Sequence, residues 1–304
     1  MIRGTELAAA WRLTRPRQWP ILSAQFAVGV ILALPPGPAL PVAVGNLGFL
    51  PLAVGWLIWV VLLNGGTLAY NSAWDRDTEA VAYLRRPPSP PLWLATASLL
   101  AMAGGAVLGF TLIGPEFGLV TALCVALSVA YSHPRPRWKG RPGLDLVTNM
   151  LGYGAGTTAA GLLTGRAALP DGIPAAGPDA ALHCLAFALL FGSFYPLTQI
   201  YQLEADRGRG DRTLTTRLGA TGALSLAMVL GLGALATMQA ALAVAGRGDR
   251  RWLPAIAMFL WLVHLWRWRR QTRGLTGEGH ERGMYRALAL WALIDIALVA
   301  AWLD

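Results

Sequence analysis

Long apolar runs, separated by short clusters of arginine and by Pro/Gly breaks, dominate the hydrophobic pattern of the chain. Most runs approach the ~20 residues that a helix needs to cross a bilayer, and they lack the apolar/polar alternation of barrel strands. Because lipid offers no partner to an open sheet edge, the pattern predicts an all-α bundle in a membrane. Nine transmembrane helices are expected, near residues 18–34, 48–74, 92–113, 116–131, 145–164, 180–203, 218–243, 253–268 and 284–302.

The composition leads to the same class of protein. Of 304 residues, 55% are hydrophobic and only 13% are charged, whereas a soluble protein carries about 25% charged residues. Soluble folds are therefore excluded. The net charge of +9 could indicate nucleic-acid binding, but the basic residues lie in short blocks between apolar runs. This distribution is typical of loops at a membrane surface, so no nucleic-acid partner is expected.

The basic residues also predict the orientation in the membrane. With a cytoplasmic N-terminus, the cytoplasmic segments hold all of the 25 basic residues except Arg166, Arg247, Arg250 and Arg251. The N-terminus is thus expected inside and the C-terminus outside. No small-residue cleavage site follows the first arginines, so the first helix is expected to remain. Cys124 and Cys184 lie in apolar runs, without metal-site or disulfide spacing, and are expected to be packing residues.

The polar connections indicate a single domain over residues 1–304. The longest of them, near 165–179 and 271–283, are too short for a separate domain. A second interpretation is two similar halves, because acidic motifs close both the second and the sixth predicted span.

The first of these motifs contains Asn71, Asp75 and Glu79. If the helix continues through them, their spacing of i, i+4 and i+8 places three oxygen-bearing side chains on one face, with Asp77 elsewhere. Mg²⁺ takes oxygen ligands and bridges carboxylates to phosphates, so this stripe predicts a metal-diphosphate site. The alternative is a solvated helix end in which Arg76 balances its acidic neighbours.

The second motif follows the sixth span. Gln199, Gln202 and Asp206 share a helical face at i, i+3 and i+7, with Glu204 offset from it. Polar residues in a membrane helix usually face the bundle interior, which makes both glutamines functional candidates. Interhelical hydrogen bonding is the structural alternative for them.

A basic loop lies between the two motifs. Lys139, the only lysine of the chain, stands there beside Arg135, Arg137 and Arg141. Such a loop can hold phosphate oxygens, although positive-inside topology alone would also place basic residues here. His133 has no second His or Cys at a suitable spacing and is expected to be an interfacial polar residue.

Taken together, these motifs resemble the UbiA superfamily of intramembrane prenyltransferases over nearly the whole chain. The ordered matches are Arg15-Pro16-Arg17-Gln18-Trp19, the NxxxDxxxE series at Asn71, Asp75 and Glu79, the loop from Tyr131-Ser132 to Gly140, Asp206, and the tail from Gly210 to Gly219.

The resemblance implies a nine-helix bundle with a lateral opening to lipid and with an isoprenyl diphosphate held between two acidic motifs near the cytoplasmic face. It implies Asp75 and Asp206 as catalytic residues, and Mg²⁺ as the cofactor on Asn71, Asp75, Glu79 and Asp206. The diphosphate is expected at Arg137, Lys139, Asn71 and Tyr131.

The sequence departs from the family pattern at three positions. Ser72 stands where the family usually has Asp, and Gln199 and Gln202 replace carboxylates of the second motif. Fewer charges hold Mg²⁺ less strongly, which leaves the number of metal ions open. Asp77 and Glu204 are the residues that could compensate.

The function expected from this resemblance is Mg²⁺-dependent transfer of a prenyl group from its diphosphate to a lipophilic or amphiphilic acceptor, which no sequence feature names. One alternative is a terpene cyclase on the same scaffold, in which the cation is captured by its own chain. Another is a transporter, but transporter acids usually lie near the membrane midplane rather than at helix ends.

Overall fold

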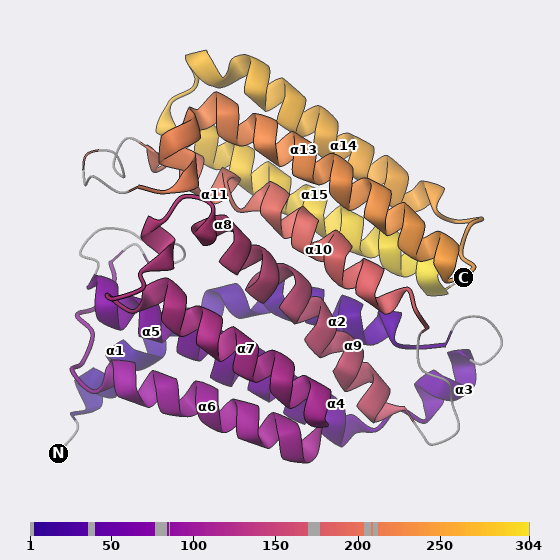
Figure 1. Cartoon of the computed structure of the whole chain (residues 1–304), viewed down its shortest axis with the longest axis horizontal. Helices are drawn as coiled ribbons and strands as arrows, with labels where there is room; N and C mark the ends of the chain where they lie inside the picture. Colours follow the sequence, from indigo (N-terminus) through magenta and orange to yellow (C-terminus); the bar gives the residue numbers. More distant parts are fainter. Residues whose placement is uncertain are drawn as a thin grey trace. The chain divides into compact units, whose positions relative to one another are not determined.

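The computed structural model describes residues 3–35, 40–76, 84, 86–169, 177–203, 208 and 212–303, and the regular elements in these ranges are helices (Figure 1). Six of them are long and apolar enough to cross a membrane. They are Phe49–Asp75 (α4, η3 and α5), Leu94–Leu112 (α6), Pro115–Ser132 (α7), Ala180–Ile200 (α10 and α11), Leu214–Val244 (α13) and Gly277–Leu303 (α15). The predicted all-α membrane class is therefore confirmed.

The other three expected spans also coincide with helices, but these do not belong to the set of six. They are Trp19–Leu32 (α2), Trp252–Gln271 (α14), and the consecutive segments Leu144–Asn149 (α8), Met150–Gly156 (η5) and Thr157–Ala168 (α9). The first has only 14 residues, the second ends in arginines, and the third is rich in Gly and Thr. Six such helices do not establish the expected count of nine.

Shorter helices complete the described chain: Gly4–Leu13 (α1), Pro16–Gln18 (η1), Leu40–Gly45 (α3), Trp138–Gly140 (η4) and Thr272–Gly274 (η6). The chain divides into two compact units. The first unit comprises Met1–Ala33, Asn46–Arg137 and Ala159–Ile173, and the second comprises Leu34–Gly45, Trp138–Thr158 and Pro174–Asp304. The sequence Asn71–Asp75 belongs to the first unit, and the segment with both glutamines belongs to the second.

In the first unit, α5, α6 and α7 pack on one another. The long helix Phe49–Asp75 widens to π geometry over Leu57–Gly65, just before α5 begins. A second contact brings α9 onto α2, where a Cβ at Gly161 would lie 2.8 Å from the Gly29 Cα. Only glycine permits this approach of the two backbones.

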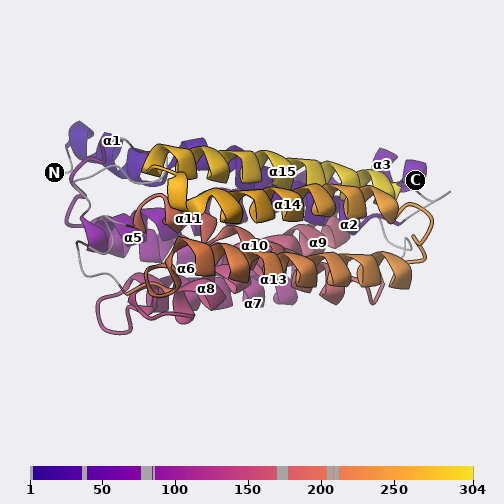
Figure 2. The ribbon, with the colours of Figure 1, turned by 90° about the horizontal axis from the view of Figure 1, so that it is seen from above.

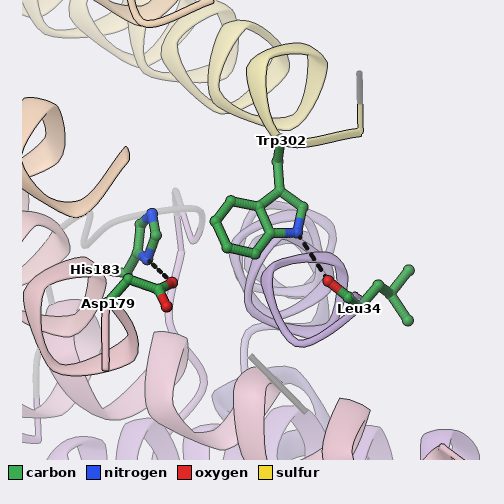
Figure 3. A network of polar contacts seen from close by, with 4 residues as sticks. All are labelled: Leu34, Asp179, His183 and Trp302. Atoms are coloured by element: carbon green, nitrogen blue, oxygen red, sulfur yellow. Dashed lines mark hydrogen bonds and ion pairs between the residues drawn. The ribbon is translucent and has the colours of Figure 1, made fainter. Parts of the chain in front are cut away.

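In the second unit, α10 packs against η5 and α13, α13 against α14, and α14 against α15; Figure 2 shows α14 and α15 side by side. A buried polar network lies at the N-terminal end of α10 (Figure 3). There the His183 Nδ1 lies 3.2 Å from Asp179, and Trp302 places its edge against the His183 ring. The Trp302 indole N–H donates to the Leu34 carbonyl oxygen at 3.2 Å, which ties the end of α15 to a segment far away in sequence.

Candidate active site

The first acidic motif stands on the last two turns of α5. Asn71 and Asp75 are one turn apart, so they share a helical face as predicted. The helix ends at Asp75, because Arg76 adopts a left-handed backbone with φ 50°. Glu79 and Asp77 lie outside the described residues, so the continuation of the face to Glu79 stays a prediction.

Two hydroxyl contacts hold α5 against α7 and thereby orient Asn71. The Ser132 hydroxyl donates to the Asn71 Oδ1 at 3.0 Å. One turn earlier on both helices, the hydroxyls of Thr67 and Ser128 lie 2.8 Å apart. This polar seam fixes the rotation of α5, so the amide and the Asp75 carboxylate face the same way. Tyr131, the neighbour of Ser132 on the last turn of α7, is half-buried.

His133 follows α7 and packs its ring against Trp74, with ring centroids 5.1 Å apart in an edge-to-face arrangement. Its Nδ1 accepts from the Arg135 backbone N–H at 3.3 Å. These contacts agree with the predicted interfacial role.

Arg15 is a candidate that the motif analysis did not single out as a site residue. It lies 8% exposed, and its guanidinium donates to the Ser72 hydroxyl at 3.5 Å. Its φ of 52° is left-handed, a conformation that costs a non-glycine residue about 1 kcal/mol or more. A buried, strained arginine thus lies beside the motif, and its partner Ser72 is the residue that replaces the family's Asp. The Arg-Pro sequence before the first span was the available signal.

The two residues of the basic loop that are predicted to bind phosphate, Arg137 and Lys139, differ in exposure. Arg137 is exposed at φ 41°, and its backbone N–H donates to the His133 carbonyl oxygen at 3.0 Å. Lys139 is half-buried in η4. The division between the two units falls between these residues, so each is described within its own unit.

Asp145 anchors the C-terminal end of this loop and was missed by the motif analysis. It is fully buried, and its two carboxylate oxygens accept from the backbone N–H groups of Gly143 at 2.8 Å and Leu214 at 3.0 Å. Leu214 is the first residue of α13, where an anion is stabilised by the helix dipole. The carboxylate thus fastens the basic loop to the start of α13, and only the fold brings these residues together.

The second motif begins after α10. The short helix α11 (Leu197–Ile200) ends before Gln202, so the expected regular face from Gln199 through Gln202 is interrupted by a turn at Tyr201. The Gln199 Nε2 donates to the Tyr195 hydroxyl at 2.9 Å, and the Gln202 Nε2 donates to the Tyr201 hydroxyl at 3.1 Å. Both amide groups are thus held by tyrosines of the same segment, while Glu204 and Asp206 lie outside the described residues.

The Gln199 carbonyl oxygen is a buried acceptor of this segment. The Oε1 atom is buried and accepts no hydrogen bond from the described part of the chain. A buried acceptor of this kind usually has a ligand or water as its partner.

The donor set suits a hard cation. In the first unit, Asn71 and Asp75 offer oxygen ligands, and in the second unit Gln199 offers another; oxygen is the donor atom that Mg²⁺ selects. Within the described ranges no group of three or more His, Cys, Asp or Glu residues forms a metal cluster. Two of the four predicted ligands, Glu79 and Asp206, lie outside these ranges, so the described residues fit Mg²⁺ as part of a ligand set.

An aromatic cluster in the second unit continues along α10 from the second motif. Phe191 stacks on Tyr153 at 5.3 Å, and Phe194 meets Trp291 edge-to-face at 5.6 Å. Trp261 is held in place by its indole N–H, which donates to Ser193 at 2.9 Å. Four segments (η5, α10, α14 and α15) thus contribute rings to one aromatic cluster, which on α10 directly precedes Tyr195 in the sequence.

Comparison with known proteins finds one related sequence and several structures of similar fold. The sequence is 31% identical over 221 residues to a lycopene elongase/hydratase of Haloarcula japonica, covering 71% of this chain and 68% of the relative. The fold is similar to that of a UbiA homologue from Archaeoglobus fulgidus bound to GPP and Mg²⁺ (TM-score 0.65, 19% identity, 96% of this chain and 99% of the other). It is also similar to a UbiA homologue from Aeropyrum pernix K1 (TM-score 0.59, 18% identity, 92% and 96%).

The sequence model of the UbiA prenyltransferase family matches residues 22–293, which includes both motifs, the basic loop and the helices that carry them. A match of this extent and the helical fold lead to one conclusion: the chain belongs to the UbiA prenyltransferase family.

Proposed function

We propose that this prenyltransferase transfers the prenyl group of an isoprenyl diphosphate to a long apolar polyene in the membrane. The observation that carries the choice of acceptor is the 31% identity, over 71% of the chain, to a protein named lycopene elongase/hydratase. Lycopene is a hydrocarbon and offers only double bonds to a binding site. The aromatic cluster next to the second motif supports such an acceptor, because ring faces pack on a polyene and attract a nearby cation.

In this proposal the polar residues bind the diphosphate end of the donor. We assign the binding of its phosphate oxygens to Arg137, Lys139, Asn71 and Tyr131. Arg15, buried next to Ser72, adds a further cation. Support for a prenyl diphosphate donor comes from the relative of similar fold that was solved with GPP and Mg²⁺.

Mg²⁺ would be held by Asn71, Asp75, Glu79 and Asp206, where it supplies charge neutralisation that makes diphosphate a better leaving group. The Gln199 carbonyl oxygen, buried and without a hydrogen bond from the described residues, is a further candidate ligand. The seam between α5 and α7 keeps Asn71 and Asp75 oriented before the donor binds. Less conformational entropy of these two side chains is therefore lost when the reaction begins.

The chemical step has three stages. The C–O bond of the donor breaks, and its electron pair leaves with the diphosphate. A double bond of the acceptor then supplies two electrons to the allylic C1 and forms a C–C bond, which leaves a tertiary cation on the acceptor. This cation loses a proton, or adds water and then loses a proton. In this proposal the aromatic cluster keeps water from the first cation and stabilises it through ring faces.

The test uses the purified full chain in lipid nanodiscs with Mg²⁺ and either dimethylallyl or geranyl diphosphate. With lycopene present, we expect a prenylated carotenoid and one diphosphate released per product; without an acceptor, we expect release at a rate lower by at least about tenfold. Formation of a cyclic hydrocarbon from the diphosphate alone would instead show the cyclase activity. Transfer to an aromatic acid or a glycerol phosphate, with lycopene unused, would contradict the polyene proposal while leaving prenyl transfer intact.

A further inference from the structure

A groove of about 510 Å³ lies between α14 and α15 in the second unit. It is separate from the motifs described above, because its lining comes from residues 260–271 of α14 and from residues 275–290. The two helices run side by side here (Figure 2). The two helices are joined by η6 and a short loop. The arginines that line the groove lie at this end of the two helices.

The floor of the groove is a fixed structure. Trp268 is only 3% exposed, and its indole N–H donates to the His280 Nδ1 at 2.9 Å. The His264 Nε2 makes a 2.9 Å hydrogen-bond contact with the carbonyl oxygen of Gly283. A Cβ at Gly283 would lie 2.7 Å from the Trp268 ring, so glycine is needed for the indole to lie flat against α15. The groove is therefore held open by packed residues.

The walls are basic at one end and apolar at the other. Arg267, Arg282 and Arg286 line the groove and are exposed, and the described lining residues include no carboxylate. Arg282 lies 3.9 Å from Glu278, a contact between two largely exposed groups that contributes little. Arg282 and Arg286 are one turn apart on α15, so their guanidinium groups point to the same side.

The apolar end begins where the arginines stop. Leu260 and Val263 lie one to two turns before Arg267 on α14, and Leu290 lies one turn beyond Arg286 on α15. Both stretches extend away from the loop that joins the two helices. The groove thus offers cations near this loop and methyl groups one to two turns further along the helices.

We propose that this groove binds an anionic phospholipid of the surrounding bilayer. Its phosphate lies among Arg267, Arg282 and Arg286, where guanidinium forks match phosphate oxygens, and an acyl chain lies along Leu260, Val263 and Leu290. Basic pockets between membrane helices are suited to anionic headgroups in this way. The apolar half of the groove favours a lipid over a free phosphate ion, which would use only the basic half.

The test compares two triple variants with equal loss of charge at the same end of the helices. Arg267→Gln/Arg282→Gln/Arg286→Gln removes the groove cations. The control, Arg269→Gln/Arg270→Gln/Arg273→Gln, removes three arginines that do not line the groove; of these, Arg269 donates to Ser225 and Arg270 lies over the Trp266 ring. Each full-length protein is equilibrated in nanodiscs of phosphatidylcholine and phosphatidylglycerol, and the retained lipid is measured by native mass spectrometry.

We expect the wild type and the control to retain phosphatidylglycerol selectively. The groove variant is expected to retain at least about tenfold less phosphatidylglycerol than the wild type. Equal losses in both variants would show attraction to general surface charge and overturn the proposal, as would a wild type without selectivity. Displacement of the lipid by excess inorganic phosphate would reduce the groove to a simple anion site. Displacement by geranyl diphosphate would assign it to the donor substrate.

A second variant keeps the charges. Val263→Trp fills the apolar half of the groove and is expected to reduce phosphatidylglycerol retention while the melting temperature changes little. Full retention in this variant would contradict the placement of the acyl chain. If the triple groove variant does not fold, Val263→Trp still tests whether a lipid occupies the groove.

Discussion

Asp75 carries the charge of the first motif within the described chain, on the last turn of α5. Replacing it by alanine removes a carboxylate that acts when the metal-diphosphate is bound. We expect Asp75→Ala, and likewise Asp206→Ala, to lower the turnover of diphosphate release by at least about 100-fold with an unchanged melting temperature. The matched control is Asp249→Ala, an exposed turn carboxylate. Near-wild-type turnover of Asp75→Ala would remove that residue from the site.

Gln199 and Gln202 are chemically alike but differently placed, which allows a paired experiment. The Gln199 carbonyl oxygen is buried without a hydrogen bond from the described residues, whereas Gln202 lies in the turn after α11. In the proposed site, a carboxylate at position 199 therefore adds a negative charge close to the bound metal. Gln199→Glu is expected to lower the Mg²⁺ concentration for half-maximal diphosphate release several-fold, roughly in line with the added ligand charge.

Gln202→Glu is the control for this substitution and is expected to leave the Mg²⁺ dependence nearly unchanged. Tyr195→Phe tests the hydrogen bond that orients the Gln199 amide. If Gln199→Glu changes the product while the Mg²⁺ titration stays the same, the residue contacts the acceptor or the cation instead of the metal.

Among the helices, α13 depends on a cap from a distant part of the chain. Asp145→Ala removes the carboxylate that accepts from Leu214 at the start of α13 and from Gly143 in the basic loop. Two part-buried N–H groups lose their acceptor, which is expected to cost about 2–4 kcal/mol of stability. Because the loop that bears Lys139 is released, KM for the prenyl diphosphate should also rise.

Thr213→Ala separates these two effects. Its hydroxyl caps the same helix by accepting from the Thr216 backbone N–H at 3.1 Å, but it is not bonded to the basic loop. We expect a loss of about 1 kcal/mol with KM unchanged. A thermal melt and a donor titration of both variants check this; equal KM values in both would show that Asp145 serves stability alone.

For the whole molecule, the distribution of arginines predicts a cytoplasmic N-terminus and an outside C-terminus. Gly248 lies in the loop before α14 and Gly274 ends η6 after α14, and a Cβ at either position meets no other atom within 4 Å. In a chain with Cys124 and Cys184 replaced by alanine, an impermeant thiol reagent should label Gly248→Cys in intact cells and Gly274→Cys only after permeabilisation. The reverse pattern would invert the topology.

The pattern along the chain predicts part of the site because some relations are local. Asn71 and Asp75 share a face since helical spacing alone requires it. The regular helix ends at Asp75 because Arg76 is left-handed, and no residue preference of arginine predicts that ending. The extension of the face to Glu79, outside the described residues, stays a prediction. The regular part of α11 ends at Ile200, and the Gln202 backbone N–H continues with a hydrogen bond to the Gln199 backbone carbonyl oxygen at 3.2 Å.

The amino-acid sequence by itself determined the membrane class, the helical architecture and the family, because bilayer thickness and backbone hydrogen bonding leave few alternatives to apolar helices. The tertiary structure alone decided which side chains meet. The contacts of Arg15 with Ser72 and of Asp145 with Leu214, the aromatic cluster and the groove between α14 and α15 each depend on how helices are rotated and packed. An apolar run does not encode that rotation, since lipid-facing and protein-facing positions in a membrane helix are equally hydrophobic.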